Sequence, residues 1–539
     1  MEQDACVRAL SGPIAPCFPE KLAPLAYGVK SQTLERMTDS GNKPTSPANL
    51  AAQLIELDRS LDVGLRDQVQ SEIARLITTG ALRSGTRLPS CRKLAGELNI
   101  SVNTVLGAYS RLCDDNLIEA RARSGYFICD DLRIPLKRVA DPAQTEAPPQ
   151  ANFVARITPH RLPSKFSYIL RPPNCQDYEY PFVCNQIDIQ RFPITEWREC
   201  TRMAMNRRDL GIWSGDNQYW DSQELLDQIC HRLLPRRGIT ADSENVLVTV
   251  GAQQALYLIA SLLRGPGRVV AMEDPGYPDA RNIFEQLFDE VRFIPVDEEG
   301  LIVDERLEGC DLVYLTPNRQ FPTTVSLSPT RRASLLEVAE KQDLLIIEDD
   351  YESDVDFRVN PPLPLYQSNR TGRVVYISSL SKSLAPGLRL GFLVAPPDLV
   401  TELRALRGMM IRHPPLVLQH AAALFLRFGH YDALCSRLHG AYERRWTIAN
   451  RILQSDFSDF GIQGEVGGTN FMLTDPAKRW PASDIVRNAL NAGLVIESVA
   501  PCFFDTNTDN FSFRVGFSAV QTVRIEPGLR ILRKVIDAL

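Results

Sequence analysis

The feature that constrains this chain most is an alternation of short apolar runs with amphipathic helical stretches, from about residue 166 to the end. The apolar runs include VLVTV (246–250), RVVAME (268–273), DLVYLT (311–316), DLLIIED (343–349), RVVYIS (373–378) and LGFLVA (390–395). Such alternation predicts a mostly parallel sheet with helices on its faces. Sheets of this kind bind ligands at the carboxyl ends of their strands, and the candidate site residues of this region follow these runs.

A second, smaller pattern precedes this region. With 539 residues the chain is longer than one hydrophobic core usually serves, so two or more domains are expected. The predicted parts are a partly disordered N-terminal extension (1–60), a helical unit that ends in a strand pair (61–130), a proline-rich linker (131–165) and the α/β domain (166–539).

Charge and cysteine content limit the classes of protein to which this chain can belong. The net charge of −6 excludes a polycation, so any contact with nucleic acid must come from a local patch. The 12 cysteines are dispersed without a C-x-x-C pair, which favours reduced thiols in a cytoplasmic chain and argues against a metal site. No apolar run is long enough to cross a bilayer, so no membrane partner is expected. The sequence does not decide whether translation starts at Met1 or at Met37.

Three helices and a strand pair are predicted in residues 61–130. The segment LRDQVQSEIARLIT (65–78) has one apolar face, and Ser90 and Ser101 stand where they would cap two further helices. Two short helices joined by a few residues are typical of a helix-turn-helix, whose second helix meets base edges through its first residues. The alternative is a small helical domain for protein contacts. The nearly balanced charge of the segment, nine Arg or Lys against eight Asp or Glu, favours that alternative somewhat.

The order of motifs in this segment resembles the GntR type of winged helix-turn-helix. The resemblance depends on a first helix, the stretch LPSCRKLA, a further helix and GYF after a basic turn. It implies that the chain binds double-stranded promoter DNA. The residues that it implies approach DNA are Arg92, Ser101, Asn103, Thr104, Arg123 and Gly125. Val102 departs from the pattern, because many members carry arginine there, and one expected DNA contact is therefore lost.

In the α/β region, the stretch SLSKSLAPGLRLGF (379–392) places a lysine in an apolar, serine-rich setting. Loss of solvation would lower the pKa of Lys382 and make its amine a nucleophile that an aldehyde would trap as a Schiff base. Arg389 can bind a phosphate through two hydrogen bonds, and Ser379 and Ser381 can add hydroxyl groups. The alternative is a lysine in a solvated loop, which is the more common role of a lysine beside serines.

Other polar residues follow the predicted strands. Asp349 could pair with a pyridinium nitrogen and Tyr351 with a phenolate oxygen, although acids at a strand end are also common as solvated turn residues. The backbone N–H groups of residues 251–253 would begin a helix after VLVTV, which suits a phosphate but also describes an ordinary turn. Tyr277 could stack on a flat cofactor or pack its own turn. These signals are weak singly, and together they point to one cofactor.

Six motifs in order resemble those of fold-type-I aminotransferases over roughly residues 180–539. They are GAQQAL, EDPGY, TPNRQFPT, IEDDY, SLSKSLAPGLRLG and FRVGF. The resemblance implies a large α/β domain that binds pyridoxal 5′-phosphate on Lys382. It also implies Asp349 at the ring nitrogen, Tyr351 at O3′ and Tyr277 over the ring, with Ala252, Gln253, Ser379, Ser381 and Arg389 around the phosphate. Arg514 matches the arginine that binds a substrate carboxylate, and the alternative role for it is a surface ion pair.

A GntR-type head joined to an aminotransferase-like body resembles the MocR subfamily of bacterial transcription regulators. The resemblance implies a homodimer that senses pyridoxal 5′-phosphate or an amino compound through Schiff-base exchange at Lys382. Two alternatives stay open, an active aminotransferase with an accessory DNA-binding head and a DNA-binding protein with a vestigial cofactor site. The chain departs from the enzyme pattern at Phe321 and Thr324, in place of Asn and Gly of NPTG, and Arg319 and Thr324 are unusual among MocR relatives. Asp279 stands where some relatives that sense an amino acid carry arginine. The cofactor set is therefore intact, while the identity of an effector is open.

Overall fold

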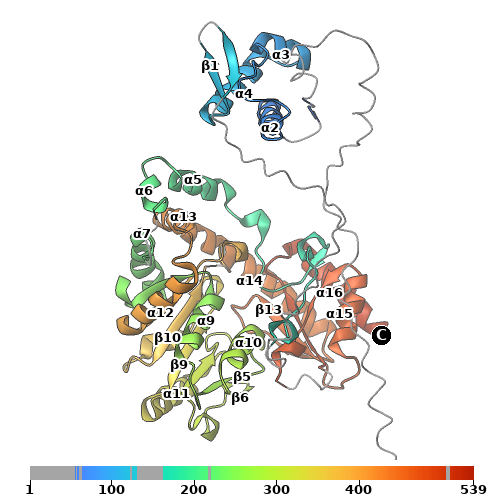
Figure 1. The fold of residues 1–539 in the computed structure, drawn as a ribbon. Coiled ribbons are helices and arrows are strands. Elements are labelled where there is room, and N and C mark those ends of the chain that lie inside the picture. The colour runs from blue at the N-terminus through green and yellow to red at the C-terminus, as the bar shows by residue number, and fades with distance from the viewer. Residues whose placement is uncertain are drawn as a thin grey trace, which may run out of the picture. The chain divides into compact units, whose positions relative to one another are not determined.

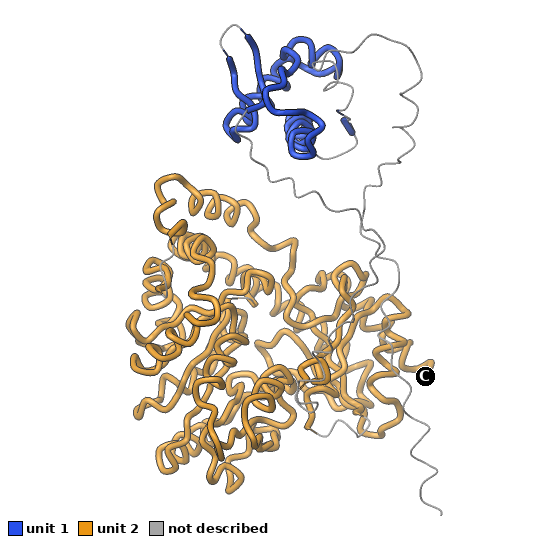
Figure 2. Tube along the Cα trace, in the orientation of Figure 1, with its two compact units in different colours: residues 1–150 blue, residues 151–539 orange. Residues whose placement is uncertain are grey.

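The computed structural model of the chain describes residues 55, 57–59, 63–121, 124–129, 162–215, 220–380, 382–504 and 510–539. The chain forms two compact units, residues 1–150 and residues 151–539, which Figure 2 colours separately. The predicted N-terminal extension and proline-rich linker fall almost wholly outside the described residues. The domain boundaries drawn from the sequence therefore stay predictions.

The first unit consists, in its described part, of three helices followed by a β-hairpin (Figure 1). Its elements are α2 (Leu65–Thr78), α3 (Cys91–Leu98), α4 (Val102–Asp114), β1 (Ile118–Arg121) and β2 (Gly125–Ile128). The two strands pair antiparallel, with Arg121 opposite Gly125. The order of elements confirms the winged helix-turn-helix predicted from the sequence.

Side-chain caps determine where α3 and α4 begin. The hydroxyls of Ser90 and Ser101 each accept a hydrogen bond from the backbone N–H three residues later, at 3.3 Å and 3.0 Å, as predicted. Between the helices, Asn99 ends α3 in the left-handed conformation, with a φ of 52°. Tyr109 of α4 is fully buried in the core of the unit and donates to the carbonyl of Pro89 at 2.9 Å. This bond fixes α4 against the loop that precedes α3.

The second unit is built on an eight-stranded sheet. Its strands are β4 (Val246–Thr249), β5 (Val269–Asp274), β6 (Glu290–Asp297), β7 (Gly300–Leu301), β8 (Leu312–Leu315), β9 (Leu345–Asp350), β10 (Val374–Ser379) and β11 (Gly391–Val394). In space they follow the order β4-β11-β10-β9-β8-β5-β6-β7. Neighbours from β10 through β9, β8 and β5 to β6 are parallel, whereas β11 runs antiparallel to both β10 and β4. The predicted mostly parallel sheet is confirmed, and all six predicted strands belong to it.

Helices cover both faces of this sheet, which explains why its strands are continuous apolar runs. One face packs against α9 (Ala252–Leu263), α10 (Pro278–Leu287) and α12 (Pro397–Ile411). The other face packs against α7 (Gln223–Gln228), α11 (Pro329–Gln342), α13 (Leu416–Arg427) and α14 (His430–Asp456). On β4, for example, Leu247 packs into the first layer, and Val246 and Val248 pack into the second.

A smaller antiparallel sheet lies in the C-terminal part of the same unit. Its strands are β12 (Gly461–Gln463), β13 (Asn470–Thr474), β16 (Ser512–Gly516) and β15 (Glu497–Ser498), in that spatial order. The helices α15 (Ala482–Asn491) and α16 (Thr522–Asp537) pack with it into a shared core. The remaining elements are α5 (Ile194–Ala204), α6 (Leu210–Trp213), α8 (Leu234–Arg236) and the parallel pair of β3 (Tyr180–Pro181) with β14 (Leu494–Val495).

Two findings concern membranes and thiols. No helix in the described ranges is both long enough and apolar enough to span a bilayer. All cysteines in the described part of the chain are free thiols.

Candidate functional site

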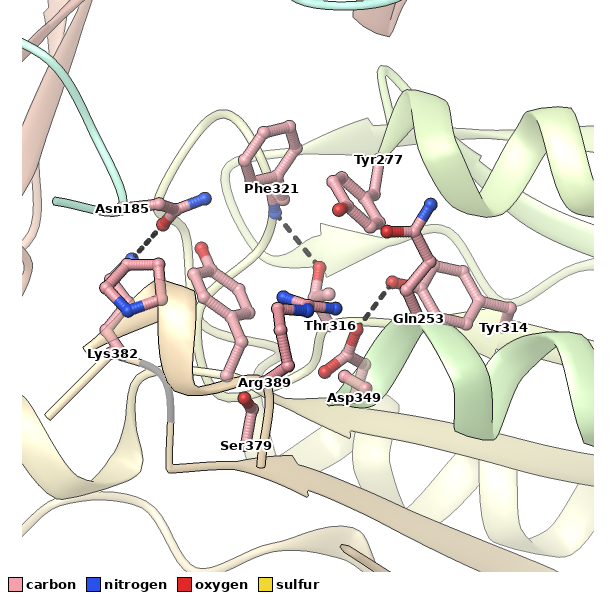
Figure 3. A pocket seen from close by; sticks show the side chains of 13 residues that line it. Asn185, Gln253, Tyr277, Tyr314, Thr316, Phe321, Asp349, Ser379, Lys382 and Arg389 are labelled. Carbon is pink, nitrogen blue, oxygen red and sulfur yellow. Dashed lines mark hydrogen bonds between the residues drawn. The ribbon is translucent and has the colours of Figure 1, made fainter. Parts of the chain in front are cut away.

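One pocket of the second unit gathers the cofactor residues predicted from the sequence (Figure 3). It lies where β4, β9 and β10 end and α9 begins, and it holds about 740 Å³ of space, counting its open mouth. Eight of the predicted residues line it, namely Ala252, Gln253, Tyr277, Asp349, Tyr351, Ser379, Lys382 and Arg389. The ninth, Ser381, lies outside the described residues. The structure thus brings together motifs that are far apart in the sequence, while the role of each residue toward a cofactor stays a prediction.

Asp349 presents a buried carboxyl group to the pocket from the end of β9. Burial raises its pKa to about 7, although the Tyr314 hydroxyl donates to Oδ2 at 2.9 Å and favours the charged form. The other oxygen, Oδ1, is buried and has no hydrogen-bond partner among the described residues. Because an unpartnered buried acceptor is costly, the position suits a ligand that brings a hydrogen-bond donor.

Lys382 is held by polar neighbours. Its Nζ donates to Asn185 Oδ1 at 2.6 Å and lies 2.6 Å from Glu352 Oε1. It also lies 4.7 Å from the centre of the Tyr351 ring. This setting differs from the apolar one expected from the sequence, because the amine is bonded to an amide oxygen and paired with a carboxylate.

Gly251 allows the N-terminus of α9 and Arg389 to approach each other. Its φ is 77°, and a β-carbon there would lie 2.7 Å from Nη2 of Arg389. Glycine alone combines this backbone conformation with this close approach. The guanidinium and the first N–H groups of α9 therefore share one end of the pocket, an arrangement suited to an anion.

Aromatic rings form another wall of the pocket. Tyr277 and Phe321 meet edge to face with 5.2 Å between their centroids, and Phe321 meets Tyr351 in the same way at 6.1 Å. The Tyr277 hydroxyl donates to Asp279 Oδ2 at 2.9 Å. Phe321, which stands in place of the asparagine of the enzyme motif, therefore packs between the two tyrosines. Asp279 is hydrogen-bonded to the hydroxyl of one of these rings, that of Tyr277.

Arg514 is fully buried on β16, so the alternative of a surface ion pair is wrong. Its Nε donates to Glu497 Oε2 at 2.7 Å, and its guanidinium lies 4.5 Å from the centre of the Phe321 ring. Its Nη2 is buried without a hydrogen-bond partner among the described residues. Arg514 lines the same small hollow as Lys382 and Tyr351.

Sequence reasoning missed several residues of the site. They are Asn185, Tyr314, Thr316 and Pro386, which line the pocket, and Glu352, which pairs with Lys382. Tyr314 lies within an apolar strand, and neither it nor Asn185 carries a signal of its own. Glu352 directly follows the motif IEDDY, so the run of acids was a signal that could have identified it.

The predicted DNA residues of the first unit lie at its surface. Arg92 in α3 is exposed, as are Ser101 and Asn103 where α4 begins. Thr104 is half-buried, and its hydroxyl lies 2.8 Å from that of Ser101, so both hydroxyls also serve the helix cap. Arg123 lies outside the described residues.

The start of the second hairpin strand depends on a glycine. Gly125 has a φ of 102°, and a β-carbon there would lie 3.6 Å from Nε of Arg87. Val102, the departure noted in the sequence, is 43% exposed at the start of α4. An apolar side chain therefore stands on the helix face predicted to meet DNA.

Fold and site together define a class of protein, a winged helix-turn-helix joined to an aminotransferase-like unit. Comparison with known families agrees, because bacterial regulatory proteins of the gntR family match residues 65–128, and aminotransferase class I and II matches residues 190–432. The chain is 36% identical over 474 residues to the HTH-type transcriptional regulator TauR of Rhodobacter capsulatus. The alignment covers 87% of this chain and 96% of that protein. It is 26% identical over 495 residues to the probable rhizopine catabolism regulatory protein MocR of Rhizobium meliloti, covering 90% and 96%. The chain therefore belongs to the MocR subfamily of GntR transcriptional regulators, as predicted.

Solved structures share the fold of the second unit. An archaeal alanine:glyoxylate aminotransferase superposes with a TM-score of 0.62 at 24% identity, covering 66% of this chain and 90% of that one. A kynurenine aminotransferase from Pyrococcus horikoshii gives a TM-score of 0.61 at 24% identity, covering 67% and 91%. At this identity the likeness shows the fold alone.

Proposed function

We propose that this regulator binds promoter DNA through α4 and the hairpin of its first unit and responds to pyridoxal 5′-phosphate or an amino compound in its second. The convergence of Lys382, Asp349 and Arg389 on one pocket, in a chain with a winged helix-turn-helix, is the observation that carries the proposal. An amine, a carboxylate and a guanidinium match the aldehyde, the ring nitrogen and the phosphate of this cofactor.

The residues present fit this cofactor on two grounds. The unpartnered Oδ1 of Asp349 would accept a hydrogen bond from the protonated ring nitrogen, and Gly251 lets Arg389 lie close to the N-terminus of α9, so that both could contact one phosphate. Tyr351 would hold the phenolate oxygen, Tyr277 would cover the ring, and Ala252, Gln253, Ser379 and Ser381 would complete the phosphate site. When bound, the cofactor supplies an aldehyde that links to amines and a ring that withdraws electrons.

Arg514 and Lys382 would recognise the two ends of an amino-acid ligand. The unpaired Nη2 of Arg514 can bind a carboxylate, while the ligand amine competes with Lys382 for the aldehyde. Displacement would free the Lys382 amine inside the unit. A ligand shifts a conformational equilibrium only when it interacts differently with the two conformations, and the change of Lys382 from a bound to a free amine would supply that difference.

We further propose that the chain acts in the cytoplasm as a homodimer, with two reading units for two half-sites of DNA. An aminotransferase is the second candidate, favoured by the convergence of Lys382, Asp349 and Arg514. Regulation accounts for more of the chain, because turnover does not require a DNA-reading unit.

Fluorescence anisotropy on the DNA upstream of the protein's own gene tests this proposal, with full-length protein at fixed salt. Pyridoxal 5′-phosphate is expected to change the affinity of the wild-type protein for this DNA. Lys382→Ala should bind the DNA with an affinity that no longer responds to the cofactor. Arg92→Ala should weaken binding roughly tenfold with and without the cofactor, because it removes one DNA contact.

The same protein preparations separate the candidate functions. A wild-type affinity for DNA that is indifferent to the cofactor and to a panel of amino acids would contradict sensing. Steady conversion of a keto acid in the presence of an amino donor would instead establish the aminotransferase.

A further inference from the structure

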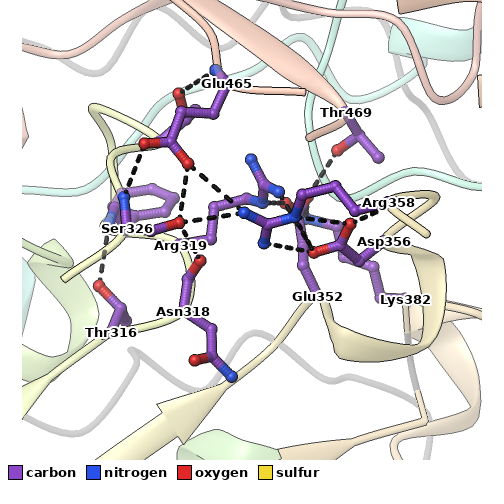
Figure 4. Close-up of polar contacts among 12 residues, drawn as sticks. Thr316, Asn318, Arg319, Ser326, Glu352, Asp356, Arg358, Lys382, Glu465 and Thr469 are labelled. Atoms are coloured by element: carbon purple, nitrogen blue, oxygen red, sulfur yellow. Dashed lines mark hydrogen bonds and ion pairs between the residues drawn. The ribbon is translucent and has the colours of Figure 1, made fainter. Parts of the chain in front are cut away.

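A line of alternating charges leads from Lys382 away from the pocket (Figure 4). In order, its members are Lys382, Glu352, Arg319, Asp356, Arg358 and Glu465, and we call this set the charge line. Glu465 belongs to the segment of residues 464–469, which precedes β13 of the four-stranded sheet. The charge line therefore joins the pocket lysine to the sheet that also carries Arg514.

Glu352 is the junction between the pocket and the rest of the charge line. It is 3% exposed, and its Oε1 lies 2.6 Å from Lys382 Nζ and accepts from the Thr469 hydroxyl at 2.6 Å. Its Oε2 lies 3.1 Å from Arg319 Nε. Burial alone would raise the pKa of Glu352, but Lys382 and Arg319 outweigh burial and hold that pKa below its ordinary value. The carboxylate stays charged, so loss of either cation leaves it under-compensated.

Arg319 is packed against the segment that leads into β13. A β-carbon on Gly468 would lie 2.6 Å from Arg319 Nη1, and one on Gly467 would lie 2.2 Å from Asp356 Oδ1. Arg319 Nη2 also donates to the carbonyl of Val466 at 3.3 Å. Because the interior is close-packed, a shift of Arg319 has to move this segment.

The loop that carries Arg319 is bonded to the far end of the charge line. Thr324 has a φ of 72°, a costly conformation for a β-branched residue, and its Oγ1 accepts from Glu465 N at 3.2 Å. Ser326 donates to the Glu465 carboxylate from its N–H at 3.0 Å and from its hydroxyl at 2.7 Å. The two departures noted in this loop, Arg319 and Thr324, therefore make contact with the same segment.

We propose that Glu352 is a positioning residue that holds the amine of Lys382 when that amine is free. When Glu352 gains or loses Lys382 as its ion-pair partner, the charge line transmits the change to residues 464–469. This inference rests on the proposed function, in which a ligand amine displaces Lys382 from an aldehyde. In that exchange the C=N bond to Lys382 breaks as one to the ligand forms, and the three protons of the ligand ammonium end on Lys382 Nζ, so a neutral imine at Lys382 becomes an ammonium while the ligand ammonium becomes a neutral imine. Glu352 and Asn185 then stabilise the new ammonium, so the two states differ by one buried ion pair.

The reactivity of Lys382 toward formaldehyde tests the role of Glu352 with no cofactor present. Full-length protein is treated with hydroxylamine and dialysed, then methylated with formaldehyde and cyanoborohydride over a range of pH. Because only the neutral amine reacts, Glu352→Gln is expected to speed labelling of Lys382 about tenfold at pH 8 and to move its pH profile downward. Lys341, whose side chain is 75% exposed, is the internal control in the same mass spectra and should not change.

The other ionisable groups around Lys382 are the same in the wild-type protein and in Glu352→Gln, so a change in the labelling profile would be caused by the loss of the Glu352 carboxylate. Among the described residues they are Asp349, Tyr351, Cys184, Arg319 and Arg514.

Asn185→Asp is a second variant with the opposite expected sign. It places a further carboxylate at the position of an oxygen that now lies 2.6 Å from Nζ, so labelling of Lys382 should slow about tenfold. This variant keeps the test decisive if Glu352→Gln does not fold. A wild-type labelling profile in Glu352→Gln would overturn the role of Glu352, and one in Asn185→Asp would overturn the control of Lys382 by adjacent carboxylates on which that role depends.

Arg319→Gln tests transmission along the charge line. Hydrogen exchange in residues 464–469 is expected to change when pyridoxal 5′-phosphate is added to the wild-type protein, and to change by less than half as much in the variant. An equal change in both proteins would overturn the transmission. Absence of cofactor absorption in both proteins would contradict the proposed function itself, which separates the two failures.

Discussion

Replacing Gly516 with alanine is expected to destabilise the second unit by about 3 kcal/mol, because the new methyl group has no room. A β-carbon at Gly516 of β16 would lie 2.5 Å from both C and O of Val183 and 2.7 Å from N of Cys184. These are backbone atoms, which cannot swing aside as a flexible side chain can. Gly516 N also donates to the Phe182 carbonyl at 3.0 Å, so the two segments are bonded where they would be forced apart.

Gly440→Ala in α14 is the matched control. The nearest atom to a β-carbon there is the end of the Arg444 side chain at 3.5 Å, and alanine is the better helix former by about 1 kcal/mol. Urea unfolding of the second unit should therefore show a large loss of stability for Gly516→Ala and none for Gly440→Ala. Equal stabilities would contradict the close approach of β16 to residues 182–184, the segment that leads into Asn185.

Asp349→Asn is expected to stabilise the cofactor-free protein and to weaken cofactor binding. The wild-type protein buries a carboxyl group whose pKa is raised to about 7 by desolvation, and an amide removes the cost of ionising it. The gain should be about 4 kcal/mol at pH 8. Loss of the charge opposite the ring nitrogen should lower the affinity for pyridoxal 5′-phosphate about 10- to 100-fold.

The sign of the pH dependence follows from the direction of this shift. The folded-state pKa of Asp349 lies above the unfolded value of about 4, so its contribution is fully present below pH 4 and is lost as the pH rises to about 7. The stability difference between Asp349→Asn and the wild-type protein should therefore grow from pH 4 to pH 7 and be constant above. Taking the difference removes the effect of Glu348, whose pKa burial also raises. A difference that does not vary with pH would contradict the raised pKa.

The architecture could be predicted from the sequence because its signals are local. Apolar runs predicted six of the eight strands of the large sheet. Ser90 and Ser101 predicted the starts of α3 and α4, which begin at the next residue in each case. The pocket could be assembled because its residues stand at fixed places in short motifs after those strands.

What could not be predicted depends on contacts between distant parts of the chain. The bond from Lys382 to Asn185 spans 197 residues, and that from Ser326 to Glu465 spans 139, and no local pattern records such pairs. For this reason the lysine was expected in an apolar setting rather than beside Glu352. Arg514 was a candidate from its motif alone, but its burial against Glu497 and Phe321 could not be predicted, because those contacts form only in the folded sheet.

Reduction with borohydride in the presence of pyridoxal 5′-phosphate, followed by peptide mass spectrometry, tests most directly whether Lys382 is the residue that binds the cofactor covalently. The prediction is one stable phosphopyridoxyl adduct per chain, on the peptide that contains Lys382, and its disappearance in Lys382→Ala. A protein that carries no adduct, or one whose adducts are spread over exposed lysines such as Lys341, would contradict it.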